Sequence, residues 1–135
     1  MRINIFLIAI IAIVAISCNE VKKETSANAI FKSEKDTIDF GTLTSYDTAE
    51  HKINISNTGT EALYISNVMA SCGCTVPKLT DTLIEAGKST TIRIKYKPHK
   101  GDSGKFSKSV VLKTNCEEPF KLIRVVGTFE PNSQE

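Results

Sequence analysis

Short runs in which apolar and polar residues alternate, repeated from about residue 37 onward, constrain the fold of this chain more than any other feature. Between residues 91 and 97, the apolar side chains Ile92, Ile94 and Tyr96 occupy every second position and polar side chains fill the positions between them. Successive side chains of a strand point to opposite faces of a sheet, so this pattern predicts a half-buried strand. No comparable stretch repeats apolar residues at helical spacing over more than a turn or so. The sequence therefore predicts an all-β domain.

Similar runs, separated by turns rich in Gly, Asn and Pro, predict seven strands in total. They lie around residues 38–43, 52–56, 63–68, 79–84, 91–97, 106–112 and 122–129. Seven short strands with regularly spaced turns are typical of an antiparallel β-sandwich of immunoglobulin type. The chain has no Trp, so the Cys–Trp–Cys core of antibody domains is absent. A small barrel is the alternative architecture.

Composition argues against two functional classes. The chain has 17 basic and 15 acidic residues, a near balance that argues against a nucleic-acid-binding protein. It contains no Gly-x-Ser-x-Gly sequence, no phosphate-binding loop and no recognisable pair of carboxylates. We therefore predict that the protein is not an enzyme, has no cofactor and does not bind nucleic acid.

The N-terminus predicts export. A basic residue, Arg2, precedes an aliphatic run over residues 3–16, which is short for a membrane-spanning helix. Ser17 and Cys18 follow, and the composition then becomes polar. This arrangement resembles a bacterial lipoprotein signal, which implies cleavage before Cys18 and attachment of palmitate-type acyl chains to it. An uncleaved signal anchor, or ordinary signal-peptide cleavage nearby, is the alternative.

These features predict the organisation of the whole chain. Residues 19–35 are polar and carry charges of both signs, so we expect a flexible tether that separates the domain from the membrane. The expected parts are a signal peptide (1–17), a lipidated Cys with its tether (18–35), an immunoglobulin-like sandwich (36–130) and a tail (131–135). The expected location is the cell envelope, facing the periplasm or the exterior, with the lipid anchor as the membrane contact and an unidentified protein as the partner.

Cys72-Gly73-Cys74 is the one stretch where a specific chemistry is expected. In the first interpretation it is structural, because buried free cysteines are commonly inert and glycine permits a tight turn. In the second it is a redox pair, either a disulfide or a dithiol, which an oxidising envelope would favour. In the third, Cys72 and Cys74 bind Cu(I) or Zn through soft sulfur ligands. The sequence leaves all three open.

Immunoglobulin topology would gather further polar residues at the same pole of the sandwich. Lys108 has the strand parity of inward-facing residues, and its ammonium would favour a thiolate nearby; alternatively, its stem covers apolar surface. His51 and His99 are candidate supporting or metal-binding residues, although an ordinary strand-end or loop histidine is the simpler interpretation of each. Cys116 is expected at the opposite pole as a partly exposed thiol, too far away to form a disulfide with either cysteine.

Seven segments, taken in order, carry a resemblance to a known family: 40–43, 57–59, 63–65, 71–75, 87–89, 104–108 and 114–115. Together they resemble an uncharacterised bacterial envelope lipoprotein family with a Hydin-type immunoglobulin-like domain and a Cys-Gly-Cys-Thr motif, domain-of-unknown-function family 1573. The resemblance covers about residues 36–130 and implies the fold and the location, but no activity. Ala86 stands where the family commonly has Pro, and residues near Asp47 replace an expected Gly.

Overall fold

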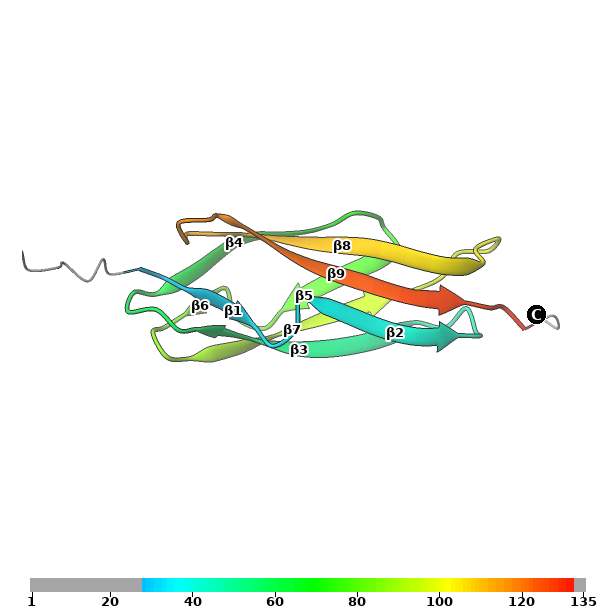
Figure 1. The fold of residues 1–135 in the computed structure, drawn as a ribbon, viewed down its shortest axis with the longest axis horizontal. Coiled ribbons are helices and arrows are strands. Elements are labelled where there is room, and N and C mark those ends of the chain that lie inside the picture. Colours follow the sequence, from blue (N-terminus) through cyan, green and yellow to red (C-terminus); the bar gives the residue numbers. More distant parts are fainter. Residues whose placement is uncertain (1–27, 133–135) are drawn as a thin grey trace, which may run out of the picture.

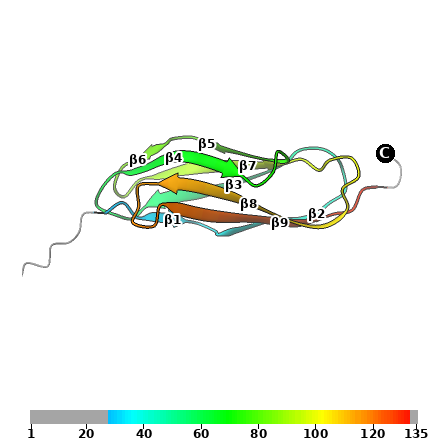
Figure 2. The same cartoon turned by 90° about the horizontal axis from the view of Figure 1, so that it is seen from above.

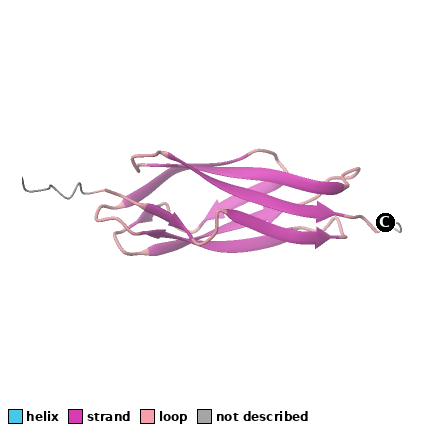
Figure 3. Cartoon of the chain, viewed as in Figure 1, coloured by secondary structure: helices cyan, strands magenta, loops and turns pink. Residues whose placement is uncertain are grey.

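The computed structural model describes residues 28–132, which form a sandwich of two β-sheets (Figures 1 and 3). No helix is present in this part of the chain, and hence none that could cross a membrane. Nine strands are present: β1 (Phe31–Ser33), β2 (Thr37–Leu43), β3 (Ala49–Asn57), β4 (Leu63–Ala70), β5 (Thr75–Leu79), β6 (Leu83–Ile84), β7 (Ser89–Tyr96), β8 (Gly104–Thr114) and β9 (Phe120–Phe129). The prediction of an all-β sandwich is confirmed.

The two sheets divide the strands into layers. One has the strand order β1-β3-β7-β5, and the other has the order β2-β9-β8-β4-β6. Figure 1 shows β8 and β9 along the top and β3 and β7 along the bottom, and in Figure 2 the strands again run along the long axis. β1 and the start of β9 therefore lie at one pole, whereas the ends of β2 and β9 lie at the other.

The core consists of the inward-facing residues of the alternating runs. On β7, for example, Ile92, Ile94 and Tyr96 are buried, while Arg93 and Lys95 are exposed. Full burial of an Ile side chain contributes about 1.5–3 kcal/mol, so the aliphatic interior is the main source of stability. Its fully buried aliphatic members from both sheets include Ile38, Ile55, Leu63, Ile92, Ile94, Val110, Leu112, Ile123 and Val125.

Two short strands account for most of the difference from the predicted seven. β1 lies within residues 18–35, the range predicted as a tether. Because Phe31 is already in a strand, the folded domain begins at least five residues earlier than the expected start at residue 36. The segment 79–84 was predicted as one strand, and this is wrong. Leu79 ends β5 in one sheet, whereas Leu83 begins β6 in the other. The residues between them form one of the crossings between the sheets.

One strand pair departs from the predicted antiparallel arrangement. β2 runs parallel to β9, from Thr37 beside Arg124 to Leu43 beside Phe129, and the register shifts between Asp39 and Thr42. Gly41 lies in this irregularity with a φ of 67°, a conformation that glycine adopts without a steric penalty. Its N–H donates to Asp39 Oδ1 at 2.8 Å, which fixes the bulge.

Candidate functional site at the Cys72–Cys74 turn

The Cys-Gly-Cys stretch forms one of the connections by which the chain passes from one sheet to the other, here from β4 to β5. Ser71 follows β4, and its N–H donates to the Ser109 carbonyl on β8 at 2.9 Å. Ser109 N–H donates to Ser71 Oγ at 3.0 Å. On the other side, Lys97 N–H donates to the Cys74 carbonyl at 2.9 Å, next to the first β5–β7 pair. The turn is therefore attached by hydrogen bonds to both sheets.

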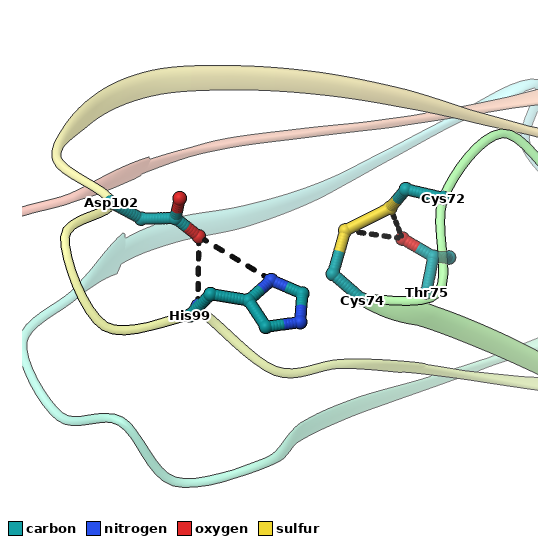
Figure 4. Close-up of polar contacts among 5 residues, drawn as sticks. All are labelled: Cys72, Cys74, Thr75, His99 and Asp102. Carbon is teal, nitrogen blue, oxygen red and sulfur yellow. Dashed lines mark hydrogen bonds and ion pairs between the residues drawn. A yellow bond between two sulfur atoms is a disulfide. The ribbon is translucent and has the colours of Figure 1, made fainter.

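Cys72 and Cys74 are joined by a disulfide across a single residue, with their Cα atoms 5.3 Å apart (Figure 4). Their environments differ: Cys72 is half-buried, whereas Cys74 is only 5% exposed. Gly73 between them is exposed, and a Cβ added there would meet nothing within 4 Å. The oxidised form of the redox interpretation is therefore the state that the structure contains.

The Thr75 hydroxyl is the polar group next to both sulfurs, and the sequence argument did not single it out. Thr75 Oγ1 lies 3.5 Å from Cys72 Sγ and 3.9 Å from Cys74 Sγ (Figure 4). The residue itself is buried, at 2% exposure. Its position as the first residue of a strand, directly after the second Cys, was the available signal.

The supporting residues predicted for this pole are held by other partners. His99 N–H donates to Asp102 Oδ2 at 2.8 Å, and its ring Nδ1 lies 3.9 Å from the same oxygen (Figure 4). His51 packs edge-on against Phe40, with ring centroids 5.9 Å apart. His99 therefore stabilises its own loop, and His51 forms part of the aromatic packing at this pole.

Lys108 is half-buried and has the inward parity predicted for it. It lines a hollow of about 340 Å³ together with Tyr96, Phe106 and Phe129. Within residues 28–132, no hydrogen bond or ion pair links its ammonium to the disulfide. The structure thus favours the interpretation in which the lysine stem covers apolar surface.

The interpretation of Cys72 and Cys74 as metal ligands is wrong for this state of the molecule. Their sulfurs are bonded to each other, so neither is a thiolate that could coordinate Cu(I) or Zn. Among the described residues, no group of three or more His, Cys, Asp or Glu side chains could hold a metal ion. Neither His51 nor His99 belongs to such a group within the described residues.

Cys116 is a free, half-buried thiol in the turn between β8 and β9. It lines a hollow of about 400 Å³ with Asn28–Phe31 and Glu117, at the pole where β1 begins. This is the end of the sandwich away from the Cys72–Cys74 turn, as the predicted topology requires. Cys18 lies outside the described residues.

Tyr96 is a titratable group in the interior at the pole that carries the Cys72–Cys74 turn. Its ring stacks on Phe106 at a centroid distance of 4.1 Å, which joins β7 of one sheet to β8 of the other. Burial raises the pKa of the Tyr96 hydroxyl above the ordinary value of 10.0, and the nearby Asp102 carboxylate raises it further. Both causes act by disfavouring the phenolate.

This pKa shift predicts a loss of stability in alkaline solution. The folded state holds the Tyr96 proton to a higher pH than the unfolded state does, so the associated stability is complete below pH 10.0 and is lost as the pH rises through the folded pKa. We expect Tyr96→Phe to unfold with a weaker pH dependence above pH 10 than the wild type. Rapid urea titrations at several alkaline pH values measure it. An identical pH dependence in the two proteins would contradict this assignment.

The fold and this turn define the class of protein: a two-sheet β-sandwich with a single-residue disulfide loop at one of the crossovers between the sheets. The family model described as "Protein of unknown function (DUF1573)" matches residues 31–129. The chain therefore belongs to this family. The match begins at the first residue of β1, in agreement with the early start of the folded domain.

Solved structures support the same fold. A protein of unknown function from Porphyromonas gingivalis W83 matches with a TM-score of 0.70 and 22% identity, over 81% of this chain and 51% of that one, so this chain spans about half its length. PapD-like domain 7 of human CEP192 matches with a TM-score of 0.62 and 11% identity, over 79% and 89%. The CupB2 chaperone of Pseudomonas aeruginosa matches with a TM-score of 0.51 and 11% identity, over 77% and 57%. No curated protein matches the chain.

Proposed function

We propose that this protein is a lipid-anchored protein of the bacterial cell envelope, and that its immunoglobulin-like domain is a non-enzymatic binding or structural module. The lipoprotein-like signal ending at Cys18 supports the anchor. The Cys72–Cys74 disulfide supports an oxidising compartment, because disulfides persist in the envelope and are rare in the cytosol. PapD-like and chaperone structures among the fold neighbours support a module that binds other proteins.

The observation that carries the binding role is an apolar surface on the outer face of one sheet. Met69 of β4, Val111 of β8 and Leu122 of β9 lie side by side in the strand register. Tyr64 and Leu83 form another cross-strand pair on the same sheet. Five of the large apolar side chains that are strongly exposed belong to this face, which we call the apolar face: Tyr64 (49%), Met69 (44%), Leu83 (59%), Phe120 (59%) and Leu122 (51%).

Grouped exposure of this kind is typical of protein interaction sites, whereas single exposed apolar residues are ordinary. The partner that fits is a protein with a complementary apolar surface.

The start of β9 adds a second element to this site. β2 begins beside Arg124, so residues 120–123 form a strand edge without a neighbouring strand in the described chain. Such an edge can pair with an extended segment of a partner.

A charge introduced into the apolar face tests this role. We expect Met69→Glu with Leu122→Glu to abolish complexes trapped by chemical cross-linking in intact cells, since one residue at the centre of an interface commonly contributes a factor of about ten or more in affinity. The matched control is Val76→Glu, because Val76 is as exposed (55%) but lies on β5 of the other sheet. Equal cross-linking by the wild type and both variants would exclude the apolar face as the binding site.

A second candidate function is favoured by one observation, the disulfide itself. A bridge between two cysteines separated by one residue is also what a small thiol-redox protein would contain. The metal-handling form of this alternative is not retained, because the sulfurs are bonded to each other.

A further inference from the structure

We propose that Cys72–Cys74 is a thiol–disulfide exchange site, in which a dithiol protein attacks Cys72, Cys74 is the leaving sulfur, and Thr75 is a positioning residue that stabilises the departing thiolate. This inference rests on the second candidate function and deepens it by naming the partner class and the direction of attack. It is independent of the lipid anchor and of the apolar face.

The difference in exposure assigns the direction of attack. A thiolate attacks a disulfide sulfur from the side opposite the sulfur that leaves, so access to the attacked atom is decisive. Cys72 is half-buried in a turn between the exposed residues Ser71 and Gly73. Cys74 is 5% exposed, and its carbonyl is bonded to Lys97 N–H. Gly73, between the two cysteines, is exposed, and a side chain there would meet open space.

The Thr75 hydroxyl lies within reach of both sulfurs, so it can donate to the Cys74 sulfur as that sulfur leaves. Thr75 Oγ1 lies 3.5 Å from Cys72 Sγ and 3.9 Å from Cys74 Sγ, within reach of a hydrogen bond to either sulfur. A disulfide sulfur is a weak acceptor, whereas a thiolate accepts a strong, charge-assisted hydrogen bond. Burial alone would disfavour an anion at Cys74, and donation from the hydroxyl offsets this cost. The contact therefore gains strength only when the disulfide opens.

The surrounding backbone allows the bridge to open without loss of the fold. The loop that the disulfide closes contains a single residue, so the entropy it removes from the unfolded chain is at the low end for disulfides. The turn is also held by backbone hydrogen bonds: Ser71 N–H donates to Ser109 O at 2.9 Å, and Thr75 N–H donates to Cys72 O at 3.3 Å. These bonds keep the two sulfurs close together after reduction. A disulfide that stabilises the fold only weakly is better suited to thiol–disulfide exchange than to a structural role.

The reaction balances with a dithiol protein as the reductant. A thiolate of that protein bonds to Cys72 Sγ, the Cys72–Cys74 bond breaks, and Cys74 leaves with the electron pair and takes up a proton. The second thiol of the donor, as a thiolate, then attacks the donor sulfur of the mixed disulfide and releases Cys72, which is protonated in turn. Two electrons and two protons pass from the donor, which becomes a disulfide. Oxidation by a disulfide protein is the reverse.

Reduction of the folded protein is the primary test, with reduced thioredoxin as the probe and Cys116→Ser as the background. Any free thiol at Cys18 is alkylated beforehand, so that only the Cys72–Cys74 pair reports. We expect reduction without denaturant at a rate far above that of global unfolding, and a reduced protein that retains a cooperative unfolding transition. Reduction that occurs only as fast as the chain unfolds would overturn the proposal, because the bridge would then be a structural brace.

Two variant comparisons test the direction of attack and the role of Thr75. In the same background, we expect the Cys72 thiol of Cys74→Ser to react about tenfold faster with an aromatic disulfide than the Cys74 thiol of Cys72→Ser, because reactivity follows exposure. We expect Thr75→Val to slow reduction by about tenfold, the factor of a hydrogen bond to a charged group, and to change the pH profile of the rate. Thr75→Ser, which keeps the hydroxyl, should restore both.

A faster Cys74 thiol, or an unchanged rate in Thr75→Val, would overturn the corresponding assignment. These outcomes are separate from those of the proposed binding role. If the redox tests fail while the apolar-face variants lose their complexes, the domain is a binding module with a structural disulfide. If the redox tests succeed while the apolar-face variants bind normally, the exchange site stands alone.

Discussion

Replacing Asn57 with alanine is expected to lower the free energy of unfolding by about 3–5 kcal/mol, which is a large effect for one polar side chain. Asn57 is completely buried at the end of β3. Its Oδ1 accepts from Ile30 N–H at 3.2 Å and from Gly59 N–H at 3.0 Å. Its Nδ2 donates to Glu61 O at 2.7 Å and to Ile84 O at 2.9 Å. One amide thus bonds four backbone groups and joins three segments of the chain, at residues 30, 59–61 and 84, at the pole where β1 begins.

The cost arises because alanine leaves those four backbone groups without the partner they have in the folded state, and an unpaired buried polar group costs about 1–3 kcal/mol. The tight approach of the chain makes replacement by water difficult. A Cβ at Gly59 would overlap the Asn28 carbonyl, so the segments are in direct contact there. Asn54→Ala is the matched control on the same strand, because Asn54 is exposed. Urea unfolding measures both, and a loss below about 1 kcal/mol for Asn57→Ala would show that the amide does not hold this pole together.

Replacing Cys18 with alanine is expected to release essentially all of the protein from the membrane and to block processing of the precursor. In the proposed account, acyl chains on Cys18 are the membrane contact, and each buried methylene contributes about 0.8 kcal/mol. Several chains therefore bind firmly, and nothing replaces them in the variant. Fractionation of cells and immunoblotting of the membrane and soluble fractions give the measurement.

Cys116→Ala is the matched control, since it removes a free cysteine of the folded domain without touching the signal sequence. This variant should be processed and sedimented with the membrane like the wild type. Full retention of the Cys18→Ala protein in the membrane, at the mature size, would exclude lipidation at Cys18.

Much of the fold could be predicted because alternation is a local property. Residues 91–97 show on their own which side chains face inward, and β7 follows that pattern throughout. β1 could not be predicted, because the three residues from Phe31 to Ser33 are too few to show a period of two. β5 contains Pro77, and a proline in the sequence argues against a strand. β5 is nevertheless the edge strand of its sheet, where the missing N–H of proline costs little.

The pairing of strands was harder to predict from the sequence, because it depends on which distant segments of the chain become neighbours in a sheet. Nothing in the Ile38 or Val125 segments indicates that β2 lies parallel to β9. At the site, the spacing of Cys72 and Cys74 was compatible with a thiol pair, a disulfide or a metal site. Only the position of the two sulfurs relative to each other distinguishes these possibilities. The topology did correctly separate Cys116 from the pair.

Intact-mass spectrometry of the full-length protein, extracted from its native membranes without reductant, tests the central claim most directly. The account predicts a chain that begins at Cys18, carries the added mass of acyl chains, and is lighter by two hydrogens because Cys72 and Cys74 are joined. An unmodified chain that retains Met1, or one cleaved elsewhere without acyl chains, would contradict the proposed anchoring.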